Sequence, residues 1–391
     1  MVRLYFGRST IASFLIIQLT IVTFFFLNQK NNVPSPEKVP DKAHILILST
    51  WRSGSTIVGQ IFSQHPDVFY LMEPGWHVWM NMRKSRYNIL QASIRDLLRS
   101  IFQCDMSAYD FYLPDPKKKQ YLFMWKFSRA LCTPPACDAF QRTDITSADH
   151  CRTLCANTNF SKVEETCKTY SHVALKEVRL FSFKTLHPLL TDPKLNLRVI
   201  HLIRDPRAVF HSREQGWASL FADNDIMWNA YNSTKYDKYK VFEDICRSQL
   251  RIYREATKEL SSFSNRYMMI RFEDLVRDPI KKVKEMYEFV NLKMTPHLME
   301  WILKMTRGKG VGDKDQAFDI TSRNAVNVSQ AWRYKLPFQT VKDVQNLCKE
   351  LMSVMGYQHV KSENQQRALK HDLTLGINDA DENQETINFW W

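Results

Sequence analysis

The stretch from His44 to Pro74 constrains the fold of this chain more than any other. It opens with an apolar run, His44–Leu48, that has the length of a buried strand. A small, hydroxyl-rich turn around one arginine follows at residues 49–56, and an amphipathic helix pattern begins at Ile57. The first N–H groups of a helix have no internal partner and lie at the positive end of its dipole. A strand, a tight polar turn and a helix in this order therefore predict a binding site for phosphate or sulfate.

The turn has two other interpretations. One is an ordinary strand–loop–helix connection in which a serine caps the helix. The other is a Walker A loop, which requires a lysine directly after its second glycine. No lysine follows Gly54, so this common nucleotide-binding loop is excluded. A second short strand, Val68–Met72, is expected to deliver Glu73 on the far side of the helix.

A second anion-binding feature follows the apolar run Leu197–Ile203, which predicts another buried strand. Arg204 stands at the end of that strand, and Pro206 suits a helix start because its missing N–H is not needed there. Ser212 then lies roughly two turns into the helix. An arginine can bind phosphate through two nitrogens, and with a helix hydroxyl it can hold a second phosphate.

The rest of the chain alternates strand and helix patterns. Strands are expected at 44–48, 68–72, 172–175, 197–203 and 266–272, and helices at 88–102, 242–260, 280–290, 296–305 and 339–355. The alternation predicts an α/β fold with a doubly wound, mostly parallel sheet. The loops after the strands would meet at one edge, where nucleotides bind. Lys176 comes directly after the third predicted strand and would lie at that edge.

The N-terminal region predicts a membrane anchor. Residues 9–29 carry no charge and have the length of one spanning helix, while Arg3 and Arg8 before them favour a cytoplasmic N-terminus. A cleaved signal peptide is the alternative, although no small-x-small cleavage site follows Leu27. The predicted organisation is a cytoplasmic tail (1–8), a transmembrane signal-anchor (9–29), a stem (30–42), a lumenal domain (43–361) and a polar C-terminal tail (362–391).

The eight cysteines are an even number beyond a membrane anchor, which predicts lumenal disulfides. Five of them lie between 132 and 167, so one must pair outside this group or stay free, and Cys104 is the expected partner. Cys246 and Cys348 are expected to pair with each other. Cys132, Cys137, Cys151 and Cys155 could also be spaced for zinc, which the lumenal context disfavours. Glycosylation sequons at Asn159, Asn232 and Asn327 agree with a lumenal domain.

The charge balance points to anionic partners. The formal net charge is +13, and basic residues are spread along the chain. Such a balance favours nucleotides, acidic glycans, nucleic acid or anionic lipid. No basic-aromatic array of the nucleic-acid-binding type is present, so a nucleic-acid partner is not expected.

With both anion-binding motifs in one predicted lumenal α/β domain, the sequence resembles the Golgi carbohydrate sulfotransferases. Within them it is most similar to the N-acetylglucosamine 6-O-sulfotransferases of the galactose/N-acetylglucosamine/N-acetylgalactosamine group. The resemblance covers about residues 43–372 and rests on WRSGST (51–56), QHPDVFYLMEPGWHVW (64–79), SRALCTPPAC (128–137), YSHVALKEVR (170–179), HLIRDPRAV (201–209), RFEDL (271–275) and NVSQAWR (327–333). Two departures are Thr56, where relatives have serine, and Gly75, where alanine is usual.

The resemblance implies a P-loop-like sulfotransferase fold and the donor 3′-phosphoadenosine 5′-phosphosulfate. It implies that Arg204 and Ser212 contact the 3′-phosphate, and that the reaction needs no metal. It also implies a single-pass type II protein of the Golgi membrane that sulfates the 6-hydroxyl of N-acetylglucosamine in glycoprotein or keratan-type glycans. The implied 5′-phosphosulfate loop consists of Trp51, Arg52, Ser53, Gly54, Ser55 and Thr56.

Four residues are expected to carry the chemistry. Arg52 would hold the 5′-phosphate and the leaving oxygen, since cations stabilise the charge that develops there. Glu73 is the expected base, because it follows the strand after the loop helix and so faces the mouth of the loop. The tyrosylprotein sulfotransferases show a similar order of motifs. That comparison places Lys176 at the leaving oxygen and Ser329 at the 5′-phosphate. His77 is the alternative base, and a purely structural role for Glu73 is the other interpretation.

Three other functions remain for comparison. A galactose 6-O-sulfotransferase differs only in its acceptor. A lumenal kinase or nucleotide hydrolase would need a Gly-Lys-[Ser/Thr] loop and metal-binding carboxylates, which the sequence does not show. A non-catalytic glycan-binding protein would be expected to lose Arg52, Glu73 or Arg204, and all three are present. The sequence leaves the glycan acceptor and a homo-oligomeric state open.

Overall fold

The computed structural model describes Gln18 and residues 42–229, 236–258, 265–310 and 321–376. The chain divides into two units, Met1–Val39 and Pro40–Trp391, and the second is described below. The predicted transmembrane helix at 9–29 lies outside the described residues, apart from Gln18. Among the residues described, no helix combines the length and the apolar character needed to cross a membrane.

The core of the domain is a parallel sheet of five strands in the order β2-β3-β1-β4-β5. All five predicted strands and their parallel arrangement are confirmed. The strands are β1 (Ala43–Leu48), β2 (Val68–Met72), β3 (His172–Glu177), β4 (Asn196–Ile203) and β5 (Tyr267–Arg271). Most boundaries agree with the prediction to within one residue, but β3 runs two residues further than predicted. Lys176 pairs with Ile47 and Glu177 with Leu48, so both charged residues belong to the end of the strand.

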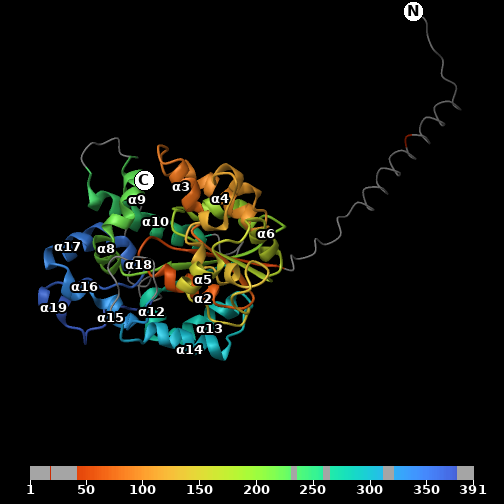
Figure 1. The fold of residues 1–391 in the computed structure, drawn as a ribbon. Helices are drawn as coiled ribbons and strands as arrows, with labels where there is room; N and C mark the ends of the chain where they lie inside the picture. Colours follow the sequence, from red (N-terminus) through yellow and green to blue (C-terminus); the bar gives the residue numbers. More distant parts are fainter. Residues whose placement is uncertain (1–17, 19–41, 230–235, 259–264, 311–320, 377–391) are drawn as a thin grey trace, which may run out of the picture. The chain divides into compact units, whose positions relative to one another are not determined.

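Helices cover both faces of the sheet (Figure 1). Successive strand residues point to opposite faces, so Ile45 and Ile47 belong to one hydrophobic core and Leu46 and Leu48 to the other. Burial on both faces explains the continuous apolar runs of these strands. The first core takes residues from α2 (Ser55–Ser63), α12 (Phe272–Arg277), α13 (Pro279–Phe289) and α14 (Pro296–Thr306). The second takes residues from α3 (Gly75–Asn81), α4 (Leu90–Phe102), α7 (His187–Leu190), α8 (Pro206–Gln215), α9 (Trp217–Trp228), α10 (Lys238–Lys258), α16 (Trp332–Lys335), α17 (Phe338–Leu347) and α18 (Lys349–Val354).

The connections after β1 and β4 create a crevice at one edge of the sheet. These strands are neighbours, yet β1 leads into α2 on one face and β4 leads into α8 on the other. Chains that leave adjacent strands in opposite directions open a crevice at the carboxyl ends of the strands, which is where α/β folds bind ligands. Both predicted anion-binding motifs therefore lie at the same crevice.

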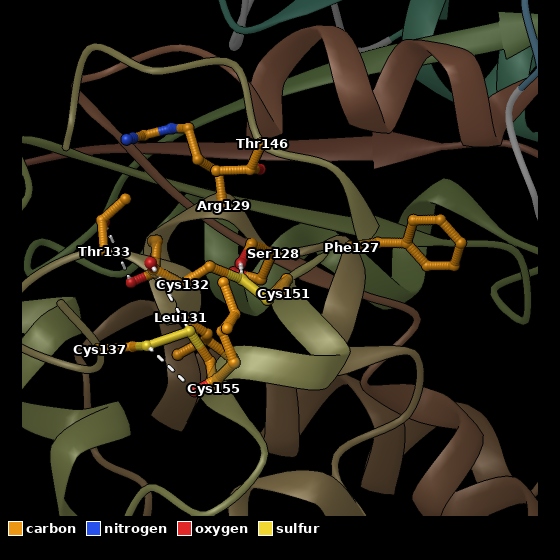
Figure 2. The surroundings of a disulfide bond; sticks show 12 residues. Phe127, Ser128, Arg129, Leu131, Cys132, Thr133, Cys137, Thr146, Cys151 and Cys155 are labelled. Carbon is orange, nitrogen blue, oxygen red and sulfur yellow. Dashed lines mark hydrogen bonds between the residues drawn. A yellow bond between two sulfur atoms is a disulfide. The ribbon is translucent and has the colours of Figure 1, made fainter. Parts of the chain in front are cut away.

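The segment between β2 and β3 is held by disulfides, as predicted. Cys104 pairs with Cys167, a member of the cysteine-rich group. The other four cysteines of that group, considered above as zinc ligands, form two further disulfides, Cys132–Cys151 and Cys137–Cys155 (Figure 2). Besides α3 and α4, this segment contains short helical turns at Ser107–Phe111, Lys119–Tyr121, Trp125–Phe127 and Arg129–Cys132, and the helices α5 (Ala148–Cys155) and α6 (Ser161–Lys168).

The predicted disulfide between Cys246 and Cys348 is also confirmed. It joins α10 to the junction of α17 and α18. The sequence predicts one helix over 339–355, but the structure divides it at Cys348, whose φ of −106° and ψ of 20° are not helical.

The folded domain extends beyond its predicted end at residue 361. Residues 362–376, predicted as part of a polar tail, pack on the domain through α19 (Glu363–Arg367) and a following segment. Gln366 is buried and donates to the carbonyls of Arg333 and Leu336. Leu375 N–H donates to the Gly356 carbonyl at 2.8 Å. These backbone partners come from distant segments, so the polar composition of the tail does not reveal them.

Candidate active site

The crevice contains a cavity of about 180 Å³ at the carboxyl ends of the strands. It brings together most of the predicted site residues from four different strand ends. These are Trp51, Arg52, Gly54, Ser55, Thr56, Glu73, Lys176, Arg204 and Ser212. Ser53 lines a small neighbouring cavity with Arg204 instead, and its buried hydroxyl has no partner among the described residues.

The turn after β1 has an unusual backbone that shapes the cavity. Gly54 has a φ of +85°, and a Cβ at this position would lie 2.3 Å from Cε2 of Phe272. Both the backbone and the packing therefore require glycine. Arg52 also has a positive φ, 70°, which costs a residue with a side chain about 1–3 kcal/mol. Its Nε donates to Oγ of Ser212 at 3.1 Å, so the turn is linked to α8.

The N-terminus of α2 faces the cavity without a neutralising group. Its N-cap is Gly54, which has no side chain, so the interpretation with a serine N-cap is wrong. The first turn contains no acidic residue, and Ser55, Thr56 and Ile57 from this turn line the cavity. The free N–H groups and the positive end of the dipole make this position suitable for an anion.

Arg204 connects the two anion-binding motifs. Its Nη1 donates to the Arg52 carbonyl and its Nη2 to the Val328 carbonyl, each at 3.0 Å. Its guanidinium lies 4.8 Å from the ring centroid of Phe272. Its buried Nε has no partner among the described residues. A buried, charged N–H group without a partner is costly, and an anion in the cavity would relieve this cost.

The charges around the cavity are strongly unequal. Among the residues described, Arg52, Lys176, Arg204 and Arg323 line it, against the single carboxylate of Glu73. Burial and the charges of Arg204 and Arg323 lower the pKa of Arg52 to about 10. Repulsion of this kind between cations indicates that the site suits a ligand with several negative charges.

Glu73 lies at the end of β2, in a turn with a φ of 47°. Its N–H donates to the Lys176 carbonyl at 2.7 Å, and its carboxylate pairs with Lys176 through Oε1 and with Arg179 through Oε2, the latter at 2.6 Å. Burial alone would raise the pKa of Glu73, but the charges and hydrogen bonds of Lys176 and Arg179 outweigh it and lower this pKa. Glu73 is therefore an ionised carboxylate that can accept a proton.

Arg179 holds this carboxylate in place. Besides Glu73, it contacts Oδ1 of Asp223 through Nε at 3.0 Å and lies 3.7 Å from Glu177. Glu177 in turn accepts hydrogen bonds from the N–H groups of Gly75 and Val178, at 2.7 and 2.8 Å. The turn that carries Glu73 is thus fixed from both sides by buried charged groups.

His77, the alternative base, lies elsewhere. Its Nε2 accepts a hydrogen bond from the Phe123 N–H at 3.1 Å, and its side chain does not line the cavity. Burial and the charge of Arg179 lower the pKa of His77 to about 4. The ring is neutral near pH 7 and its acceptor nitrogen is already used by the backbone.

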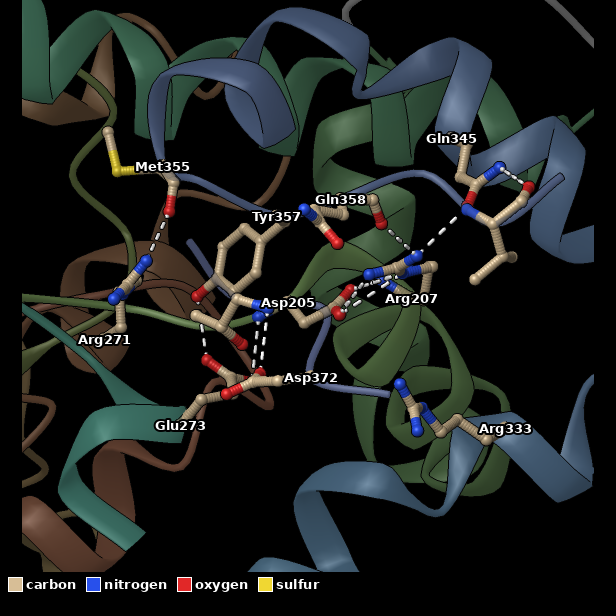
Figure 3. A network of polar contacts seen from close by, with 12 residues as sticks. Asp205, Arg207, Arg271, Glu273, Arg333, Gln345, Met355, Tyr357, Gln358 and Asp372 are labelled. Carbon is tan, nitrogen blue, oxygen red and sulfur yellow. Dashed lines mark hydrogen bonds and ion pairs between the residues drawn. The ribbon is translucent and has the colours of Figure 1, made fainter. Parts of the chain in front are cut away.

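Ser329 lies on α15 (Ala325–Gln330) and does not line the cavity that contains Glu73. Its hydroxyl donates to the Val326 carbonyl at 2.8 Å, and the residue lines a neighbouring cavity together with Asp205 and Glu273. Figure 3 shows the polar network beside that second cavity, in which the Asp205 N–H and the Tyr357 hydroxyl both donate to Glu273. The role of Ser329 at the 5′-phosphate stays a prediction.

Sequence reasoning missed three residues of the site. Phe272 was expected as the last residue of a strand, but it begins α12 and its ring lines the cavity. Its position after an apolar strand, at the ligand-binding edge, could have marked it. Arg323 comes from a polar segment, and Asp223 from the middle of a helix. Neither has a local signal, because long-range packing alone brings them to the site.

Comparison with known proteins gives a consistent result. The family model described as "Sulfotransferase domain" matches residues 42–356. The chain is 47% identical over 375 residues to carbohydrate sulfotransferase 5 of Mus musculus, which covers 95% of this chain and 94% of the relative. It is 46% identical to carbohydrate sulfotransferase 6 of Homo sapiens, with 95% of each chain covered. It is 45% identical to carbohydrate sulfotransferase 4 of Mus musculus, with 91% of this chain and 92% of the relative covered.

Proposed function

Because this chain belongs to the sulfotransferase domain family, we propose that it transfers a sulfuryl group from 3′-phosphoadenosine 5′-phosphosulfate to the 6-hydroxyl of N-acetylglucosamine in a glycan. The observation that carries the proposal is the cavity itself. An uncapped helix N-terminus and three arginines face it, and one ionised carboxylate lies among them.

The residues present fit a donor with two separate phosphate groups. The first turn of α2 and Arg52 would hold the 5′-phosphosulfate, where Gly54 leaves the backbone open. Arg204 and Ser212 would hold the 3′-phosphate, and the unpartnered Nε of Arg204 supports this assignment. The ring of Phe272 offers an apolar face to the adenine base.

The reaction breaks the bond between sulfur and the bridging oxygen and forms a bond between sulfur and the sugar oxygen. Arg52 and Lys176 would stabilise the negative charge on the bridging oxygen as that bond breaks. Glu73 would accept the proton of the 6-hydroxyl. Lys176 pairs with Glu73 in this structure. When Lys176 turns towards the leaving oxygen, Glu73 loses one of its two cations and becomes a stronger base.

The cellular setting is proposed from separate features. The apolar segment at 9–29 favours a single-pass type II protein. Four disulfides favour an oxidising compartment. The sequon residues Asn159 and Asn327 are exposed and so accessible to glycosylation, while Asn232 lies outside the described residues. We therefore place the domain in the lumen of the Golgi apparatus, anchored in its membrane.

An acceptor panel with a ³⁵S-labelled donor tests the proposed function. The panel contains glycans with terminal N-acetylglucosamine, with internal N-acetylglucosamine and with galactose alone. We expect label in the N-acetylglucosamine glycans. Transfer only to galactose would contradict the acceptor assignment, and transfer to none of the three would contradict the proposal of carbohydrate sulfotransfer.

A further inference from the structure

The turn at residues 49–56, which we refer to as the donor loop, has a second side that faces the interior of the domain. There it borders a small cavity beside the reaction cavity, lined by Thr50 and Ser53 of the loop and by Gln249 of α10. The small cavity leaves about 10 Å³ for the centre of a water molecule. That is about the volume that one water needs, and it is too small for a larger ligand.

Three polar groups of this lining have no hydrogen-bond partner among the described residues: Thr50 Oγ1, Ser53 Oγ and Gln249 Nε2. The three residues are 3%, 1% and 3% exposed, so bulk water does not reach them. Buried polar groups in folded proteins are nearly always paired, because an unpaired one loses its bonds to water without replacement. Three such groups around one cavity therefore indicate a shared partner inside it. Arg204 lines both cavities, and its Nε binds the donor phosphate in the proposed function.

The orientation of the Gln249 amide is set from the sheet. Its Oε1 lies 3.1 Å from Nε2 of His201 on β4, and Nδ1 of the same ring lies 2.8 Å from the Tyr267 hydroxyl. An amide oxygen only accepts, so Nε2 of His201 carries the proton and donates. Burial lowers the pKa of His201 to about 4, so the ring is neutral near pH 7 and its Nδ1 accepts from Tyr267. The NH₂ group of Gln249 is thus left as a donor to the cavity.

We propose that one buried water molecule occupies this cavity and bridges Thr50, Ser53 and Gln249, and that Gln249 thereby positions the donor loop. A water accepts a hydrogen bond from the Gln249 amide and exchanges hydrogen bonds with the two hydroxyls. Buried waters typically make about three such bonds, which matches the number of unpaired groups. A cation is disfavoured, because the NH₂ group of Gln249 offers it no lone pair.

The bridge acts on a loop whose backbone is strained. Arg52 has a φ of 70°, and such a conformation persists only where the surroundings hold it. Two direct hydrogen bonds contribute: the Ser49 hydroxyl donates to the Leu202 carbonyl at 2.7 Å, and Arg204 donates to the Arg52 carbonyl at 3.0 Å. The water adds a connection from α10. Gln249 does not line the reaction cavity, so it is a positioning residue, and this role rests on the proposed function.

The water itself is tested by diffraction from crystals of the full-length protein. We expect one ordered water within about 3.2 Å of Thr50 Oγ1, Ser53 Oγ and Gln249 Nε2. The double variant Thr50→Val, Gln249→Leu makes the lining more apolar at nearly constant volume. Apolar cavities stay dry, so the structure of this variant should lack the water. A cavity without ordered density in the unaltered protein, or direct hydrogen bonds among the three groups, would overturn the assignment.

The positioning role is tested by calorimetric binding of adenosine 3′,5′-bisphosphate. Thr50→Val and Gln249→Leu should each weaken binding about 2- to 10-fold, because each removes one hydrogen bond of the bridge. Thr50→Ser keeps the hydroxyl and should retain the affinity. The matched control is Thr133→Val, because Thr133 is fully buried, its hydroxyl lies 3.0 Å from that of Tyr170, and it lines neither cavity. This control should lose stability but bind the nucleotide normally.

A double-mutant cycle separates a shared water from two independent contacts. If one water joins Thr50 to Gln249, the double variant should bind the nucleotide about as well as the weaker single variant, because either substitution already breaks the bridge. Additive losses would refute the shared bridge, and unchanged affinity in both single variants would refute the positioning role. If the unaltered protein binds no nucleotide at all, the proposed function and the positioning role fail together, and diffraction still decides on the water.

Discussion

Replacing Glu73 by glutamine removes the proposed base while keeping the shape of the side chain. Glu73 is 2% exposed and pairs with Lys176 and Arg179. A positioned general base contributes about 10²–10⁴ to the rate, which corresponds to about 2.7–5.4 kcal/mol of activation free energy. We expect kcat to fall by that factor in Glu73→Gln.

Two other quantities, the folding stability and the donor affinity, separate this effect on kcat from a loss of structure. The amide oxygen of glutamine can still accept from Arg179, so about one charged hydrogen bond is lost, worth about 1.5–3 kcal/mol of folding stability. The variant also removes the only carboxylate that lines the cavity among the described residues. Donor affinity should therefore stay the same or increase.

The assay combines single-turnover transfer of labelled sulfate with calorimetric binding of adenosine 3′,5′-bisphosphate. A suitable control is Glu255→Gln, because Glu255 accepts hydrogen bonds from Ser182 and Phe183 and does not line the cavity. That variant should lose stability but keep its kcat. The role of Glu73 as base would be refuted if its glutamine variant kept more than about a tenth of the original kcat. A parallel loss of product affinity would instead assign Glu73 a structural role.

Three further predictions concern the loop, the fold and the response to pH. Gly54→Ala places a side chain at a φ of +85° and against Phe272. We therefore expect calorimetry to show at least a tenfold loss of affinity for adenosine 3′,5′-bisphosphate. Unchanged affinity would refute the close packing of the loop. Removing the disulfide Cys246–Cys348, which closes a loop of 102 residues, should lower the free energy of unfolding by about 2–5 kcal/mol in urea titrations; an unchanged value would show that the crosslink does not constrain the chain. Burial and the Asp205 carboxylate raise the pKa of Glu273 from 4.5 to about 6, so the folded protein favours the protonated form of this side chain. Protonation of Glu273 therefore contributes up to about 2 kcal/mol to the free energy of unfolding below pH 4.5. This contribution is lost as the pH rises through 6. Glu273→Gln should lack this slope in thermal unfolding between pH 4.5 and 6.5, and a slope equal to that of the unaltered protein would contradict the assignment.

Those parts of the fold that depend on local pattern could be predicted from the sequence. The apolar runs at His44–Leu48 and Leu197–Ile203 identify central strands, because both faces of β1 and β4 are buried. The residues after each run then had to meet at one edge of a parallel sheet. This reasoning was sufficient to bring Arg52 and Arg204 into one site.

Features that depend on long-range partners could not be predicted. Charged residues inside β3 look like a loop in the sequence, since the partners that stabilise them lie on other elements. Lys176 forms an ion pair with Glu73, about a hundred residues earlier, and Arg179 forms one with Asp223, which lies on α9. The same limit applies to the cysteine-rich group, because its five cysteines together with Cys104 allow fifteen connectivities and spacing does not choose among them.

In the proposed reaction, this cavity directs sulfate to the 6-hydroxyl of N-acetylglucosamine. The most direct measurement compares a disaccharide that ends in N-acetylglucosamine with its 6-deoxy analogue, using a labelled donor at equal acceptor concentrations. We expect labelled product from the parent disaccharide and none from the 6-deoxy analogue. Equal labelling of the two acceptors would contradict it.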